Sequence, residues 1–246
     1  MQTFRLLPLS LLFASSTVFA NSTQVYIEQN VASNAADDGT YATEAGALIE
    51  TSENGQVFIG MDDQGWLAAG YGHNFSLSDD LGLTLYGEVG KWETGEELLV
   101  EAIVDYQINE SINVFTGLGY NISGQVIEKL SDTAINTNKF IAGTNMSIAG
   151  FDLNYTYTHA NSDGTNGYIH IDNSAYFSQG DYRTNEHEIV LSKQIDNWTP
   201  YLKYTYFNTH EGSLTATGQG ENSASTLINS PVDNDSIWTL GVSYQF

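Results

Sequence analysis

Hydrophobic and polar residues alternate along the last nine residues of the chain. Trp238, Leu240, Val242, Tyr244 and Phe246 are apolar or aromatic, and the residues between them are small or polar. A period of two residues is typical of a β-strand with one apolar and one polar face. The same alternation recurs through the chain and predicts twelve strands. They cover residues 24–33, 41–51, 56–62, 65–76, 82–92, 97–108, 111–122, 137–148, 150–160, 185–195, 199–209 and 236–246.

The lengths of the strands and of their connections indicate how the strands are arranged. Most predicted strands have about ten residues, which suits a tilted crossing of a lipid bilayer. Short turns such as Asn54-Gly55 and 196–198 alternate with longer polar connections such as 123–136, 161–184 and 210–235. Short turns at one end, longer loops at the other and an even strand count are typical of bacterial barrels with both termini in the periplasm. The predicted fold class is therefore all-β, a 12-stranded antiparallel transmembrane β-barrel.

A secreted β-sandwich or lectin-like domain is the soluble alternative. Its strands usually run five or six residues, shorter than those predicted here, and it has no reason to gather tyrosines near strand ends. An alternating last strand that ends in a phenylalanine also resembles bacterial outer-membrane β-barrel proteins. The resemblance implies a Gram-negative outer-membrane location, contact with outer-membrane lipid, and recognition of the last strand, with Phe246, by the barrel-assembly machinery.

The N-terminal residues have the features of a secretory signal peptide. Arg5 is followed by an apolar run over 6–13 and by Val18-Phe19-Ala20, a small-residue cleavage site. An N-terminal membrane anchor is the alternative, but the apolar run is far shorter than the ~20 residues that a spanning helix needs. The predicted organisation is a cleaved signal peptide at 1–20 and an outer-membrane β-barrel at 21–246.

Composition excludes several kinds of chemistry. The chain has no cysteine, which excludes disulfides and thiol catalysis, and its five histidines are scattered without metal-type spacing. We therefore predict no metal site and no cofactor. A barrel phospholipase needs a nucleophile and a histidine that both face lipid, and neither His159 nor His187 has such a partner on a predicted strand. The sequence predicts that the protein is not an enzyme.

The charge balance is strongly acidic. Thirty acidic residues stand against seven basic ones, for a formal net charge of −23 at pH 7. Such a balance repels nucleic acid and attracts cations. A general adaptation of secreted proteins to salt would give the same balance, so the placement of the charges matters more than their number.

Alternation assigns the two faces of each predicted strand. In 97–108, Val100 and Val104 are expected to face lipid, which places Glu101 and Asp105 inside the barrel. Nine acids and two bases are assigned to the lumen in this way, and two bases cannot neutralise nine acids. The carboxylate excess predicts a pore that prefers cations. The predicted pore-lining residues are Glu28, Glu44, Glu50, Glu88, Glu101, Asp105, Lys139, Asp152, Glu186, Glu188 and Lys203.

One hairpin resembles a known family. The segment 185–192, with sequence NEHEIVLS, and the following Asn197-Trp198-Thr199-Pro200-Tyr201 resemble the penultimate hairpin of the small oligosaccharide porins typified by the oligogalacturonate-specific porin. That family implies a monomeric twelve-stranded barrel that passes acidic oligosaccharides through a lumen lined by arginines. Here Arg183 is the single arginine that follows the predicted signal peptide, so neutral or cationic solutes are expected instead.

Two functions follow as hypotheses. The first is an outer-membrane porin that allows passive diffusion of small hydrophilic solutes, with oligosaccharides among the candidates, through an acidic lumen. The second is a structural or adhesive surface barrel whose lumen is plugged by its own side chains and whose extracellular loops carry the function.

Overall fold

The computed structural model describes residues 22–32, 41–92, 95–124, 135–163, 167–171, 174–179, 182–212, 214–219, 228–230 and 235–246. The predicted signal peptide lies outside the described residues, so its cleavage stays a prediction. Within the described residues all regular structure is β-strand. No described segment forms a helix that is long and apolar enough to span a membrane.

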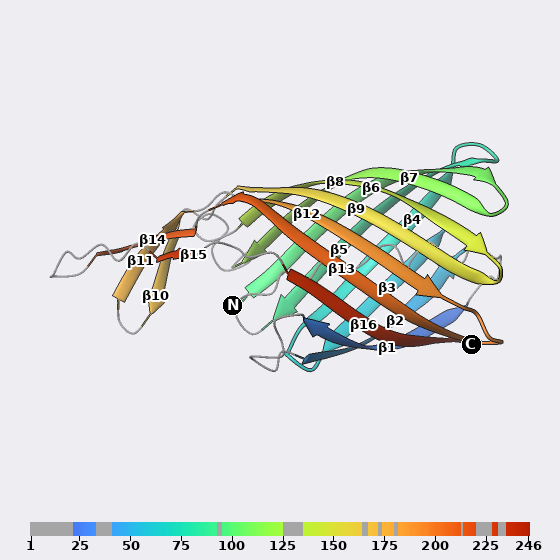
Figure 1. Ribbon diagram of the computed structural model, residues 1–246, viewed down its shortest axis with the longest axis horizontal. Helices are drawn as coiled ribbons and strands as arrows, with labels where there is room; N and C mark the ends of the chain where they lie inside the picture. Colours follow the sequence, from blue (N-terminus) through green and yellow to red (C-terminus); the bar gives the residue numbers. More distant parts are fainter. Residues whose placement is uncertain are drawn as a thin grey trace.

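Twelve strands form a closed antiparallel barrel (Figure 1). Each strand pairs with its neighbours in chain order, and the barrel closes where β1 pairs with β16, from Gln24 opposite Gln245 to Ala32 opposite Ile237. The barrel strands are β1 (Thr23–Ala32), β2 (Tyr41–Ser52), β3 (Gly55–Asp62), β4 (Leu67–Ser76), β5 (Leu81–Trp92), β6 (Gly95–Asn109), β7 (Ile112–Gly124), β8 (Ile135–Ile148), β9 (Phe151–Asp163), β12 (Tyr182–Ser192), β13 (Trp198–Gly212) and β16 (Asp235–Gln245).

The predicted fold class is confirmed, because all twelve predicted strands occur and close into one barrel. The strand ends differ from the prediction mostly by one to three residues, for example β6, which begins at Gly95 rather than at residue 97. Paired strands extend each other's ladders beyond the point where side-chain alternation stops, because backbone hydrogen bonds do not depend on side-chain polarity. The alternation therefore locates the strands better than it locates their ends.

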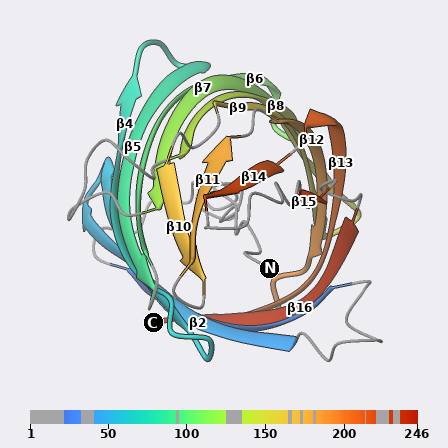
Figure 2. The same cartoon turned by 90° about the vertical axis from the view of Figure 1, so that its left-hand side faces the viewer.

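A second, small sheet was not predicted. It contains β10 (Gly167–Ile171), β11 (Ser174–Gln179), β14 (Leu214–Gln219) and β15 (Ile228–Ser230), in the order β10-β11-β14-β15. It joins the connection after β9 to the connection after β13, and it projects beyond the end of the barrel opposite the C-terminus (Figures 1 and 2). These strands have three to six residues, too few for a clear alternation pattern.

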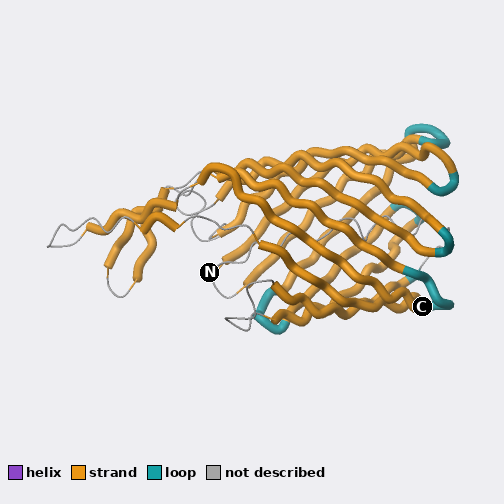
Figure 3. The backbone as a smooth tube through the Cα atoms, viewed as in Figure 1, coloured by secondary structure: helices purple, strands orange, loops and turns teal. Residues whose placement is uncertain are grey.

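Tight turns connect the strands at the C-terminal end of the barrel (Figure 3). The turn between β8 and β9 consists of Ala149 and Gly150, which have positive φ values of 52° and 78°. Positive φ at both central residues is the geometry of a type I′ turn, which matches the right-handed twist of the paired strands. The predicted tight hairpins at this end, which the fold class places in the periplasm, are thus explained by backbone geometry.

The burial pattern is the reverse of that in a soluble protein. Outward-facing apolar side chains are exposed, and Leu240 at the middle of β16 is 68% exposed, whereas its inward neighbour Thr239 is fully buried at 0%. Charged side chains such as Glu28 and Lys203 are buried inside the barrel. An apolar outer face is what contact with hydrocarbon requires, so the barrel has the form of a membrane-spanning one.

Candidate functional site: the charged lumen

The structure places the predicted lumen residues on the inward face of their strands. Eight of them are buried and three are partly exposed. Whether they line a conducting pore is not settled by their position and stays a prediction. The buried ones are Glu28, Glu44, Glu88, Glu101, Lys139, Glu186, Glu188 and Lys203, and the partly exposed ones are Glu50, Asp105 and Asp152.

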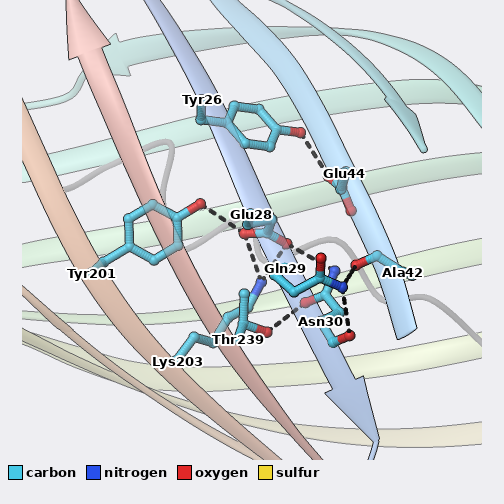
Figure 4. A network of polar contacts seen from close by, with 9 residues as sticks. All are labelled: Tyr26, Glu28, Gln29, Asn30, Ala42, Glu44, Tyr201, Lys203 and Thr239. Carbon is cyan, nitrogen blue, oxygen red and sulfur yellow. Dashed lines mark hydrogen bonds and ion pairs between the residues drawn. The ribbon is translucent and has the colours of Figure 1, made fainter. Parts of the chain in front are cut away.

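Lys203 forms a buried polar network near the strand pair that closes the barrel (Figure 4). Its Nζ donates to both carboxylate oxygens of Glu28, at 3.1 and 3.4 Å. The Tyr201 hydroxyl donates to Glu28 Oε2 at 2.7 Å, and Asn30 donates to Oε1 at 3.3 Å. Glu28 lies on β1 and Lys203 on β13, so this ion pair spans β16, which runs between them.

A second charged group lies on the wall formed by β5 to β8. Lys139 Nζ is 3.9 Å from Glu101 Oε1, and both side chains are nearly inaccessible to solvent. The Tyr86 hydroxyl donates to Glu88, and Asn121 donates to Glu97. Lys139 and Lys203 are thus each paired with a carboxylate, while several of the other inward carboxylates accept hydrogen bonds from hydroxyl or amide groups.

Sequence reasoning missed Glu97. It lies four residues before Glu101 on the same face of β6, so alternation alone places it inside the barrel. The prediction began this strand at residue 97 and did not assign a face to its first residue. With Glu97 included, the inward carboxylates named here rise from nine to ten, against two lysines.

Three inward tyrosines lie flat against glycines of neighbouring strands. A Cβ added at Gly46, Gly70 or Gly241 would lie 2.1–2.5 Å from an atom of Tyr26, Tyr86 or Tyr201, respectively. Because glycine has no side chain, there is room for each aromatic ring, and each tyrosine hydroxyl donates to a carboxylate. The pairs are Tyr26 with Glu44, Tyr86 with Glu88, and Tyr201 with Glu28. Which glycine lies beside each tyrosine depends on the register between paired strands, so alternation along a single strand does not predict these contacts.

Gly241 offers a test of this packing. Changing Gly241→Ala is expected to displace the Tyr201 ring and to lower the free energy of unfolding by about 1–3 kcal/mol, the usual cost of overpacking. Reversible urea unfolding in lipid vesicles measures the change. Gly87→Ala is the matched control, because its added Cβ would meet nothing closer than 3.9 Å. Equal effects at the two glycines would contradict the proposed packing.

An apolar cluster occupies another part of the inner wall. Leu48, Phe58 and Ala68 lie on β2, β3 and β4, and Trp66 directly precedes β4. The four are buried together, with Tyr26 packed against them. The ring centroids of Phe58 and Trp66 are 6.4 Å apart. The lumen therefore has an apolar, aromatic sector beside its charged sectors, which the sequence prediction did not include because it selected inward residues by charge.

The two histidines considered for catalysis lie on the outward face. The Tyr155 hydroxyl is 2.9 Å from His187 Nδ1, and His159 Nδ1 is 2.8 Å from Asn185 Oδ1. The hydrogen-bond partners of the two rings in these strands are thus a tyrosine and an asparagine. Among the described residues, no three metal-binding side chains are grouped closely enough to hold a metal ion.

These features define the class of fold: a closed twelve-stranded barrel of the outer-membrane porin type, with an apolar outer face and a charged interior. The NanC porin is a similar solved structure, with 12% sequence identity, a TM-score of 0.63, and coverage of 89% of this chain and 98% of that chain. The KdgM porin in complex with disordered oligogalacturonate is 8% identical, with a TM-score of 0.59 and coverage of 91% and 99%. The predicted resemblance to oligosaccharide porins is thereby confirmed in the fold.

The same fold also occurs outside porins. The translocator domain of the autotransporter NalP from Neisseria meningitidis is 12% identical, with a TM-score of 0.55 and coverage of 95% of this chain and 91% of that chain. No family model matches the chain, and no curated protein matches it. At these identities the similarity establishes the fold, so a function has to be argued from the lumen.

Proposed function

We propose that the protein is an outer-membrane channel for passive diffusion of small hydrophilic solutes, with a preference for cations. The observation that carries the proposal is the inward excess of carboxylates over lysines, together with the pairing of both lysines with glutamates. Carboxylates that face a lumen lower the barrier for cations and raise it for anions. The closure of the barrel within a single chain supports a monomer, and the terminal Phe246 supports recognition by the barrel-assembly machinery.

The solutes are proposed to be neutral or cationic. One similar solved structure, the KdgM porin, holds an oligogalacturonate, whose sugars carry carboxylates. In the present lumen ten inward carboxylates stand against two lysines, and this excess opposes the entry of such an anion. Oligosaccharides without acidic groups stay among the candidates.

Neutralising lumen carboxylates tests the cation preference. In planar bilayers under a KCl gradient, the wild-type channel is expected to give a reversal potential biased toward cations. Changing Glu101→Gln and Asp105→Asn together is expected to move that potential measurably toward zero, because both side chains face inward on β6. Glu110→Gln is the matched control, since this residue is exposed in the turn between β6 and β7. An unchanged potential in the double variant would contradict the assignment.

The alternative, a surface barrel with a plugged lumen, also has specific support. Many inward side chains are almost completely buried, and the small sheet β10-β11-β14-β15 extends from the end of the barrel opposite the C-terminus. Under this alternative, purified protein inserted into a bilayer would show no conductance steps. Discrete cation-selective steps would support the channel instead.

A further inference from the structure

The lumen already contains one site for an ammonium group, which is filled by a side chain of the protein. Lys203 Nζ lies between the two carboxylate oxygens of Glu28, and the Tyr201 hydroxyl donates to the same carboxylate at 2.7 Å. A tyrosine held over a glycine thus fixes a glutamate, and the glutamate binds the ammonium group. Hydrogen bonds of this kind, with both partners charged, are among the stronger ones in proteins.

The same arrangement recurs on β5 and β6. The Tyr86 ring lies over Gly70, and its hydroxyl donates to Glu88. Tyr86 is directly opposite Glu101 in the strand pairing, and Glu88 is opposite Leu99, between Glu97 and Glu101. Three carboxylates therefore gather around this tyrosine, whereas one carboxylate accepts from Tyr201. We call Glu88, Glu97 and Glu101 the β5–β6 carboxylates.

Lys139, the base that lies beside the β5–β6 carboxylates, is close to one oxygen of Glu101 but leaves the other without a donor. Lys139 Nζ is 3.9 Å from Glu101 Oε1, but Glu101 Oε2 is buried and has no hydrogen-bond partner among the residues that the structure describes. The Glu101 side chain is only 6% exposed, so this oxygen is withdrawn from solvent. Buried carboxylate oxygens are nearly always hydrogen-bonded, so the free oxygen indicates the place of a donor that the protein does not supply.

The kind of donor follows from the geometry. A primary ammonium group carries three N–H donors and one positive charge, so it can donate to the free oxygen of Glu101 while the neighbouring carboxylates attract its charge. Lys203 shows that this lumen accommodates such a group beside a tyrosine and a glutamate.

We propose that the β5–β6 carboxylates and Tyr86 form a binding site for the primary ammonium group of a permeating solute. The inference rests on the proposed channel function and narrows its solutes to hydrophilic molecules that carry an amine, such as amino sugars. Lys139 limits the affinity by neutralising part of the site, which is suitable for a solute that has to leave again.

Glucosamine, at a pH below the pKa of its amine, is the probe, and N-acetylglucosamine is its uncharged counterpart. Calorimetric titration of the detergent-solubilised protein is expected to detect binding of glucosamine and not of N-acetylglucosamine. Glu101→Gln and Glu97→Gln are each expected to raise the dissociation constant roughly tenfold, as loss of a charged hydrogen-bond partner does. Glu110→Gln removes an exposed carboxylate in the turn between β6 and β7, outside the lumen, and is expected to leave the constant unchanged.

The outcomes separate this inference from the channel proposal. Binding that weakens in the Glu101 and Glu97 variants but not in the Glu110 variant supports the site, whether or not the protein conducts. Equal binding of both sugars, or equal weakening by all three variants, overturns it. Potassium conductance in planar bilayers is measured separately, and its absence would overturn the channel proposal while the titration still decides the site.

Discussion

Replacing Lys203 with methionine is expected to lower the free energy of unfolding of the barrel by about 3–5 kcal/mol, the usual cost of breaking a buried ion pair from one side. Glu28 is only 4% exposed, so removing its cation leaves a carboxyl group without a charged partner in a poorly solvated position. The Tyr201 hydroxyl remains as a donor but carries no charge. Reversible urea unfolding in lipid vesicles, followed by tryptophan fluorescence, measures the difference.

Two further variants show whether the cost comes from the uncompensated carboxylate. Combining Lys203→Met with Glu28→Gln is expected to recover much of the stability, because the double variant has no buried charge at this position. Lys91→Met is the surface control: its side chain is 72% exposed, and its ion pair with Glu96 at 3.7 Å is expected to contribute less than about 1 kcal/mol. Similar losses at Lys203 and Lys91 would contradict the buried ion pair.

Placing an arginine on the outer face tests the orientation of the whole barrel. Leu240→Arg is expected to lower the free energy of unfolding in a bilayer by about 2–4 kcal/mol, because a base at the midplane loses its hydration. Leu240 is the middle residue of β16 and is 68% exposed on the outer face. The same vesicle unfolding assay applies.

The matched control is Ile195→Arg, in the turn between β12 and β13. Ile195 is also an exposed aliphatic residue, at 52%, but it lies at the end of the barrel, where a base is expected to cost about 0–1 kcal/mol. A larger loss at Ile195 than at Leu240 would mean that the exposed apolar band does not face hydrocarbon.

The strands and their two faces could be predicted from the sequence because alternation is local. In a strand such as β16, the alternation of apolar and polar residues is enough to identify the residues that face outward. The neighbouring strands need not be known. The inward position of Glu101 and the outward position of Val100 follow from this alone. Closure into a barrel followed from strand number and length, which again require no contact information.

The contacts inside the lumen could not be predicted in this way. Tyr201 lies over Gly241 because β13 and β16 pair those two residues directly, and Glu28 meets Lys203 across a strand that lies between them. Both facts depend on register and on the curvature of the closed sheet. That Glu101 Oε2 has no hydrogen-bond partner among the described residues likewise depends on where the surrounding side chains lie, which the sequence pattern does not give.

The Glu28–Lys203 pair can form only when the last strand is in place. Its two members are 175 positions apart in the chain, and they meet only when β16 has docked between β1 and β13. Before β16 docks, each of the two charges is hydrated. Burying either of them without the other would cost free energy. A nascent chain halted ahead of β16 should therefore remain open and susceptible to quality-control proteases.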